Sequence, residues 1–226
     1  MRWVDVAAYV RALRALLRGE DVEWEGATIR MLHPKGYVAA RPVDVPILIG
    51  ADGPKGLAVA AELGDGVFSA GVPQRGTEMA WRAMLTFGTV LDEGEDPAGP
   101  RVEAAAGHGV AVAFHATYER GGPAAVDSLP GGAAWRASVE AVPEAERHLA
   151  THEGHLVALN RHDHAVWPDA AVLVEPVTFS GTPAQLATKV EGFAAAGVTE
   201  LAYQPAGDIP TELRRMAAAL TLTPPG

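Results

Sequence analysis

The stretch Pro46-Ile-Leu-Ile-Gly-Ala-Asp-Gly-Pro-Lys-Gly56, continued by Glu62-Leu-Gly-Asp-Gly-Val-Phe-Ser-Ala-Gly71, predicts a strand, a turn, a helix and a second strand. The apolar run 47–49 is typical of a strand that is covered on both faces. Pro54 suits the first position of a helix, and the glycines before it let the backbone turn sharply and approach a ligand. A glycine-rich turn that leads into a helix presents free N–H groups, which hold phosphate well.

The glycine spacing of this turn does not identify a ligand by itself. Gly50, Gly53 and Gly56 recur every third residue, which is not the spacing of the dinucleotide-binding fingerprint. A connection between strand and helix that binds nothing is therefore the alternative to a phosphate site.

The composition indicates a soluble globular protein with one domain over residues 1–226. The chain has 226 residues, of which 48% are hydrophobic and 20% charged. A net charge of −10 argues against nucleic acid or an anionic membrane as a partner. The chain has no cysteine, no apolar run of about 20 residues and no signal-peptide pattern, so we expect a cytoplasmic protein without disulfides or thiolate metal sites.

The remaining pattern predicts further helices and strands. We expect an amphipathic helix over the first 20 residues and a small hairpin excursion near residues 21–40. Helical spacing predicts a helix over residues 77–91, and the small apolar residues 102–114 predict a buried strand that ends at His115. A helix capped by Thr182 and Gln185, a strand over 198–203 and a last helix after Asp208 complete four parallel strands, each followed by a helix.

Histidines gather in the middle of the chain. His148, His152 and His155 would share one face of a continuous helix, with Glu153 among them, which raises the alternative of a metal site. Gly154 interrupts that helix, and the HExxH order is absent. We therefore predict no metal here and expect a polar lid or a packing role.

Three pieces of the chain resemble the bacterial luciferase-like family of flavin-dependent oxidoreductases and monooxygenases. They are Tyr-Val-Arg-Ala-Leu-Arg-Ala-Leu-Leu-Arg-Gly-Glu at 9–20 with Val-Glu-Trp-Glu-Gly at 22–26, the stretch 45–67 described above, and Phe-Ser-Gly-Thr-Pro-Ala at 179–184 with Ala-Ala-Gly-Val-Thr-Glu-Leu at 195–201. The resemblance implies a TIM-barrel enzyme that binds FMN or the deazaflavin coenzyme F-420 and acts on a small organic substrate. The cofactor's phosphate would lie on the loop after Ile49.

The carboxyl ends of barrel strands carry the ligand-facing groups, which gives a set of candidate residues. For the cofactor these are Gly50, Ala51, Asp52, Gly53, Pro54, Lys55, Ser69, Ala70 and Gly71. The candidates for catalysis are His115, at the end of the expected third strand, and His152, in the stretch that covers the flavin in the resembling family. Tyr203 is either a core tyrosine with a paired hydroxyl or a ligand contact.

Members of the resembling family usually carry roughly a hundred further residues before the counterpart of Val4, which hold the first four strands of the barrel. We therefore expect an α/β fold that forms the C-terminal half of a TIM barrel. Unpaired strand edges would favour a homo-oligomer, and the chain alone would be catalytically weak. The alternatives are a shortened flavin-binding or dimer-forming protein without turnover, and a metal-dependent hydrolase built on the histidines.

Overall fold

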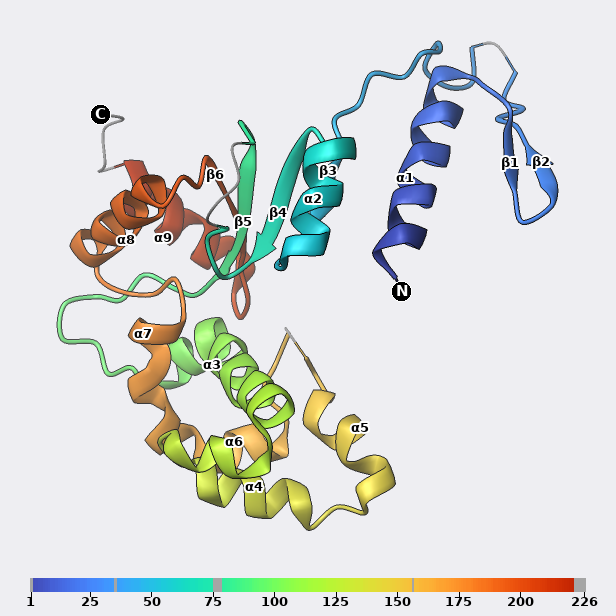
Figure 1. Cartoon of the computed structure of the whole chain (residues 1–226). Helices are drawn as coiled ribbons and strands as arrows, with labels where there is room; N and C mark the ends of the chain where they lie inside the picture. The colour runs from blue at the N-terminus through green and yellow to red at the C-terminus, as the bar shows by residue number, and fades with distance from the viewer. Residues whose placement is uncertain (1, 35, 75–78, 156, 222–226) are drawn as a thin grey trace. The chain divides into compact units, whose positions relative to one another are not determined.

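The computed structural model describes residues 2–34, 36–74, 79–155 and 157–221 (Figure 1). The chain forms two compact units, and each is described by itself. Unit 1 comprises Met1–Met84 and Ala196–Leu201, and unit 2 comprises Leu85–Ala195 and Ala202–Gly226.

Unit 1 begins with the predicted amphipathic helix and hairpin. Helix α1 (Trp3–Arg18) ends at Gly19, whose φ of +88° is the left-handed conformation that glycine adopts most readily. Strands β1 (Val22–Trp24) and β2 (Ala27–Ile29) then pair antiparallel around a turn at Glu25 and Gly26. Both sequence predictions are confirmed.

The strand–turn–helix–strand prediction is also confirmed. Strand β3 (Leu48–Gly50) leads into α2 (Pro54–Leu63) and then into β4 (Gly66–Ala70), which pairs parallel to β3 with Gly50 opposite Phe68. Helix α1 packs against α2. The buried residues of this core are Val10, Ile49, Ala51, Ala60 and Val67.

Four strands form one sheet in the order β3-β4-β5-β6. Strands β5 (Arg82–Phe87) and β6 (Glu200–Gln204) begin in unit 1 and end in unit 2. In unit 1 the backbone N–H of Thr199 donates to the Arg82 carbonyl at 3.0 Å, beside the start of both strands. The half barrel stays a prediction.

Strand β5 corrects the prediction of a helix over residues 77–91. Residues 82–87 are extended, and 75–78 lie outside the described residues. Trp81, Met84 and Leu85 have helical spacing in the sequence. In the strand, however, Ala83 is buried on one face, and Met84 and Thr86 are buried on the other. A strand covered on both faces loses the alternation that distinguishes it from a helix.

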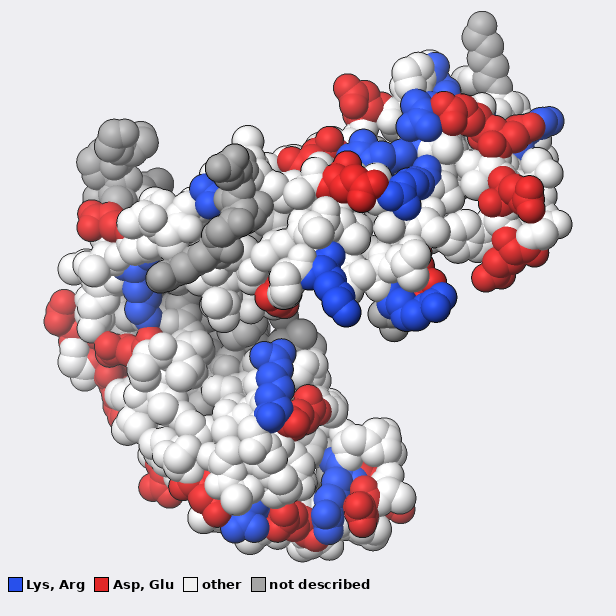
Figure 2. Space-filling view, viewed as in Figure 1, with Lys and Arg blue, Asp and Glu red and all other residues white. Residues whose placement is uncertain are grey.

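Positive and negative side chains lie next to one another on the face that Figure 2 shows. In unit 1, Arg11 pairs with Glu62 at 2.5 Å and Arg14 pairs with Asp65 at 2.6 Å, so charges of α1 are matched by charges on and after α2. The arginines of α1 are thus engaged within the chain.

Unit 2 is mainly helical. Its helices are α3 (Pro100–Gly121), α4 (Gly132–Glu140), α5 (Arg147–His152), α6 (Arg161–Ala170), α7 (Val174–Val177), α8 (Pro183–Ala195) and α9 (Ile209–Thr221), with 3-10 turns η1 (Pro123–Ser128), η2 (Glu144–Glu146) and η3 (Ala171–Leu173). Phe114, Trp135 and Trp167 are large members of its core. None of the described helices is long and apolar enough to cross a bilayer.

Helix α3 corrects the prediction of a buried strand over residues 102–114. Pro100 starts the helix after Gly99, and most of its middle is buried. A Cβ at Gly107 would come 3.1 Å from Leu159, and one at Gly109 would come 2.6 Å from Phe87. Small residues on several faces let neighbours approach the helix closely, so the apolar run has no clear helical period.

The predicted caps near the end of the chain are confirmed. The Thr182 N–H donates to Gln185 Oε1 at 2.7 Å, and the Gln185 N–H donates to Thr182 Oγ1 at 3.4 Å, which is the reciprocal pattern of a capping box. Asp208 accepts from the N–H of Thr211 at 3.3 Å in the first turn of α9.

Candidate functional site

The loop between β3 and α2 has the backbone geometry of an anion site. Gly53 is the N-cap of α2, and the first N–H groups of a helix have no partner within the helix. A Cβ built at Gly53 would meet no described atom within 4 Å, and one at Gly50 would meet only the Phe68 carbonyl oxygen at 4.0 Å. The loop therefore has open space beside its glycines, where an anion can approach the backbone.

Gly56 has a different role from the other two glycines. It is buried, and a Cβ there would lie 2.4 Å from Trp3 Cζ2 and 2.8 Å from Ala51 Cβ. This glycine lets α2 approach α1 closely. Only Gly50 and Gly53 of the triplet face open space.

The two charged side chains of the loop have opposite sign. Lys55 and Asp52 are both exposed, and Asp52 Oδ1 accepts from Gln74 Nε2 at 3.0 Å. Because the two charges offset each other, the features that favour an anion here are the backbone N–H groups and the positive end of the α2 dipole.

The end of β4 lies next to this loop. The Ala51 N–H donates to the Phe68 carbonyl at 3.1 Å, which brings the loop beside Ser69, Ala70 and Gly71. Ser69 is buried, and its hydroxyl lies 3.5 Å from the Ala83 carbonyl of the neighbouring strand. Ala70 and Gly71 are exposed at the strand end, whereas the buried Ser69 side chain faces the neighbouring strand of the sheet.

The two histidines chosen as catalytic candidates lie among helices. His115 belongs to α3 and not to a strand end, which corrects its expected place, and His152 is the last residue of α5. Their ring centroids are 5.5 Å apart, so the structure brings them together. His115 Nε2 lies 3.3 Å from Asp163 Oδ1, and His152 Nε2 lies 2.6 Å from Glu119 Oε1.

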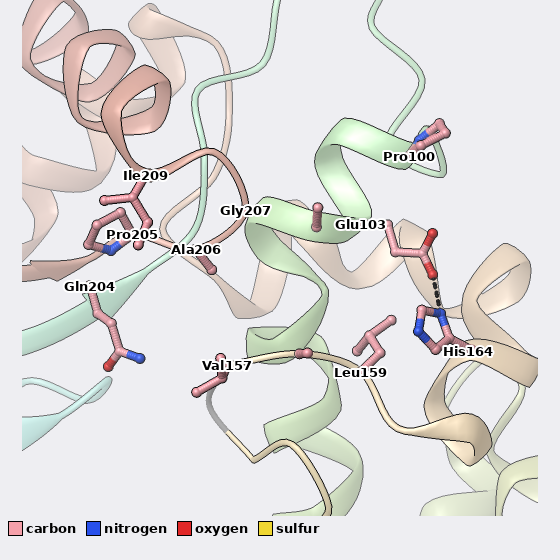
Figure 3. Close-up of a pocket in the computed structure, with 12 residues that line it drawn as sticks. Pro100, Glu103, Val157, Leu159, His164, Gln204, Pro205, Ala206, Gly207 and Ile209 are labelled. Atoms are coloured by element: carbon pink, nitrogen blue, oxygen red, sulfur yellow. Dashed lines mark hydrogen bonds and ion pairs between the residues drawn. The ribbon is translucent and has the colours of Figure 1, made fainter.

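A cavity of about 620 Å³ lies in unit 2 at the carboxyl end of β6 (Figure 3). Its lining is mainly apolar, and its polar groups include Gln204 and a close pair, with His164 Nδ1 2.7 Å from Glu103 Oε1. The residues that line it are Pro100, Glu103, Ala104, Val157, Ala158, Leu159, His164, Gln204, Pro205, Ala206, Gly207 and Ile209. This size and lining suit a small organic molecule.

The sequence did not predict the Glu103–His164 pair. Glu103 stands in the segment interpreted as a strand, and 61 residues separate it from His164. The only local signal was the cluster of polar residues around His164, which does not identify a partner.

Tyr203, also near the end of β6, is a paired core tyrosine. Its hydroxyl donates to the Gly88 carbonyl at 2.9 Å, and burial raises the pKa of the phenol to about 12. The hydroxyl is thus paired, as one of the two interpretations expected, and the ring is half-buried.

Comparison with known proteins identifies the family. A family model described as luciferase-like monooxygenase matches residues 2–200, so the chain belongs to the luciferase-like family. A 58-residue segment, 26% of the chain, is 43% identical to a 5,10-methylenetetrahydromethanopterin reductase of Archaeoglobus fulgidus and covers 17% of that protein.

A solved structure shares the fold. An F420-dependent secondary alcohol dehydrogenase in complex with an F420-acetone adduct aligns over 99% of the chain with a TM-score of 0.51 and 13% identity. The chain spans 62% of the length of that protein. This likeness shows a luciferase-like α/β fold.

Proposed function

We propose that the chain functions in an oxidoreductase that uses a flavin or deazaflavin, either FMN or coenzyme F-420. The observation that carries this proposal is the loop at the start of α2, where Gly50 and Gly53 leave open space beside free backbone N–H groups. Membership of the luciferase-like family supports it, as do the activities of the two relatives, a reductase and an F420-dependent dehydrogenase.

The residues of the loop fit the phosphate of either cofactor. Gly53 and the first turn of α2 would hold the phosphate through N–H groups, and the exposed Lys55 would add a charge. Ala70 and Gly71 are exposed beside the loop, and a Cβ at Gly71 would meet no described atom within 4 Å, so we expect the part of the cofactor next to the phosphate to lie there. A bound flavin or deazaflavin supplies hydride chemistry, while the protein binds, orients and excludes water.

The cavity of unit 2 is the proposed site for a small organic substrate. In this proposal the Glu103 carboxylate accepts the Nδ1–H of His164 and so leaves Nε2 free to exchange a proton with a substrate oxygen. Replacing His164 by Gln would then lower kcat by about 100-fold or more. A change in KM alone would contradict a role for this imidazole in proton transfer.

Cofactor binding tests the proposal directly. FMN and F-420 are each titrated against the wild type and the Gly53→Val variant, with binding followed by cofactor fluorescence. Gly53 has extended φ and ψ of −132° and 165°, so valine fits the backbone while its side chain enters the open space. Gly192→Val is the matched control, because Gly192 of α8 is exposed and has open space around it.

We expect one of the two cofactors to bind the wild type and the control, and to bind Gly53→Val much more weakly. Equal affinity in all three proteins would overturn the assignment of the loop. Turnover with reduced FMN or reduced F-420 separates an enzyme from a flavin-binding protein without turnover.

A further inference from the structure

Three histidines of unit 2 converge on one point. They are His115 of α3, His152 at the end of α5, and His155 in the turn that follows (helices in Figure 1). One ring nitrogen of each lies within 4.8 Å of the corresponding nitrogens of the other two. The ring centroids are 5.5 Å apart for His115 and His152, 5.7 Å for His115 and His155, and 5.0 Å for His152 and His155.

These separations match those of imidazoles that share a metal ion. With Zn–N bonds of about 2.0–2.1 Å and tetrahedral angles, the centroids of three ligand rings lie roughly 5 Å apart. Packing alone does not explain why three imidazole nitrogens lie so close together. In such a cluster, ring nitrogens that accept hydrogen bonds are left without a donor.

His115 has the strongest indication of a missing ligand. Its side chain is 3% exposed, and its Nδ1 is buried without a hydrogen-bond partner among the described residues. Its Nε2 faces Asp163, whose Oδ1 also accepts from Trp135 Nε1 at 2.7 Å. Asp163 thus orients the ring and leaves Nδ1 available, as carboxylates behind metal-bound histidines do.

His152 has a similar arrangement. Glu119 of α3 lies 2.6 Å from its Nε2, which leaves Nδ1 as the nitrogen available to a metal. His155 is exposed, so an ion can enter from solvent. Two of the three rings therefore have a carboxylate behind them, and the third gives access.

We propose that His115, His152 and His155 bind one divalent transition-metal ion, with Zn²⁺ the best fit, and that water or an added ligand completes the coordination. Three imidazoles at this spacing suit Zn²⁺ and related ions rather than Mg²⁺ or Ca²⁺, which prefer oxygen ligands. The site lies within unit 2, whereas the loop at Gly53 belongs to unit 1.

Gly154 makes this site possible, although in the sequence it argues against a metal site because it interrupts the expected helix. Its φ is +70°, and a Cβ there would lie 2.9 Å from the Ala158 carbonyl oxygen. The left-handed turn brings the His155 N–H to the His152 carbonyl at 3.1 Å and places both rings beside His115. The helical spacing in the sequence points to His148 as the third ligand, whereas in the structure His115 takes that place.

A metal here would tie α3 to the chain segment that forms one wall of the cavity. Val157, Ala158 and Leu159 line that cavity and follow His155 closely in the chain. The ion would therefore hold the wall in place without touching the cavity itself.

Metal titration tests the proposal on the full chain, purified without an affinity tag and treated with a chelator. We expect one Zn²⁺ per chain by calorimetry and elemental analysis, and a four-coordinate visible spectrum when Co²⁺ replaces it. His155→Ala should abolish this binding, and its exposed position leaves the fold intact. Glu119→Gln should weaken it by about 10-fold, because Glu119 only orients His152.

His148→Ala is the matched control, since His148 is exposed on α5, the helix that carries His152, and lies outside the cluster. It should bind Zn²⁺ as the wild type does. Absence of stoichiometric binding, undiminished binding by His155→Ala, or equal losses in His148→Ala and His155→Ala would each overturn the proposal. Circular dichroism of each variant shows that the fold is retained.

Discussion

Gly56 of α2 lies against the indole of Trp3 of α1, so closely that a single added carbon would come 2.4 Å from Trp3 Cζ2. Gly53, three residues earlier, has open space on the side where a Cβ would point. Glycines that look equivalent in the sequence therefore have separate roles, since Gly56 permits helix packing and Gly53 leaves the anion site open.

Alanine at these two positions should separate the roles. Gly56→Ala overpacks the contact with Trp3 and should lower the free energy of unfolding by about 1–3 kcal/mol. Gly53→Ala adds a methyl group to open space and should change it by less than about 0.5 kcal/mol. Urea unfolding of both variants measures the difference, and equal effects would contradict this division.

His108 should make the fold sensitive to mild acid. It is 2% exposed, neither ring nitrogen has a partner within the described residues, and burial lowers the pKa from 6.5 to about 4. Between these values the unfolded chain binds a proton that the folded chain does not. The contribution of His108 to the free energy of unfolding is therefore fully present above pH 6.5 and is lost as the pH falls to about 4. The loss from this one group is at most about 3 kcal/mol.

His108→Leu removes the titrating group and places an apolar side chain beside Phe87. The free energy of unfolding of the variant should fall less steeply than that of the wild type between pH 6.5 and pH 4. Parallel pH profiles for the two proteins would show that His108 does not carry this sensitivity.

Arg101 and Glu212 form an ion pair between α3 and α9. Arg101 Nη1 lies 2.8 Å from Glu212 Oε1, and the Glu212 side chain is 2% exposed. Arg101→Met would leave a buried carboxylate without its cation and should lower the free energy of unfolding by about 3 kcal/mol. The double variant Arg101→Met, Glu212→Met should recover part of that loss, and a larger loss in the double variant would contradict the explanation.

Local signals in the sequence predicted the elements that carry turn and cap chemistry. Gly53 and Pro54 marked the start of α2, and Thr182 with Gln185 marked the start of α8, because caps depend on neighbouring residues only. The family resemblance added a luciferase-like α/β fold, which the family match over residues 2–200 and the solved structure support.

For two elements that are buried on several sides, the sequence predicted the wrong kind of structure: a strand in place of α3 and a helix in place of β5. Helix α3 and strand β5 are both surrounded by apolar neighbours, so neither shows the period of its own geometry. The length of α3 and the Gly99-Pro100 start were the available signals for a helix.

The contacts of the candidate sites depend on tertiary structure. His115 and Asp163 are 48 residues apart in the chain, and Glu103 and His164 are 61 residues apart. Their approach follows from how α3 packs against α6, which no local pattern reports.

If the loop at Gly53 holds the cofactor's phosphate, ligands with and without that phosphate should bind with different affinity, and comparing them is the most direct test. Dissociation constants are measured for FMN and riboflavin, or for F-420 and its phosphate-free deazaflavin core, on the wild type and on Gly53→Val. We predict that the wild type prefers the phosphorylated ligand by at least about 10-fold, since one charge-assisted hydrogen bond contributes about 1.5 kcal/mol or more. Gly53→Val should lose this preference and keep its affinity for the phosphate-free ligand, whereas the same preference in both proteins would contradict the account.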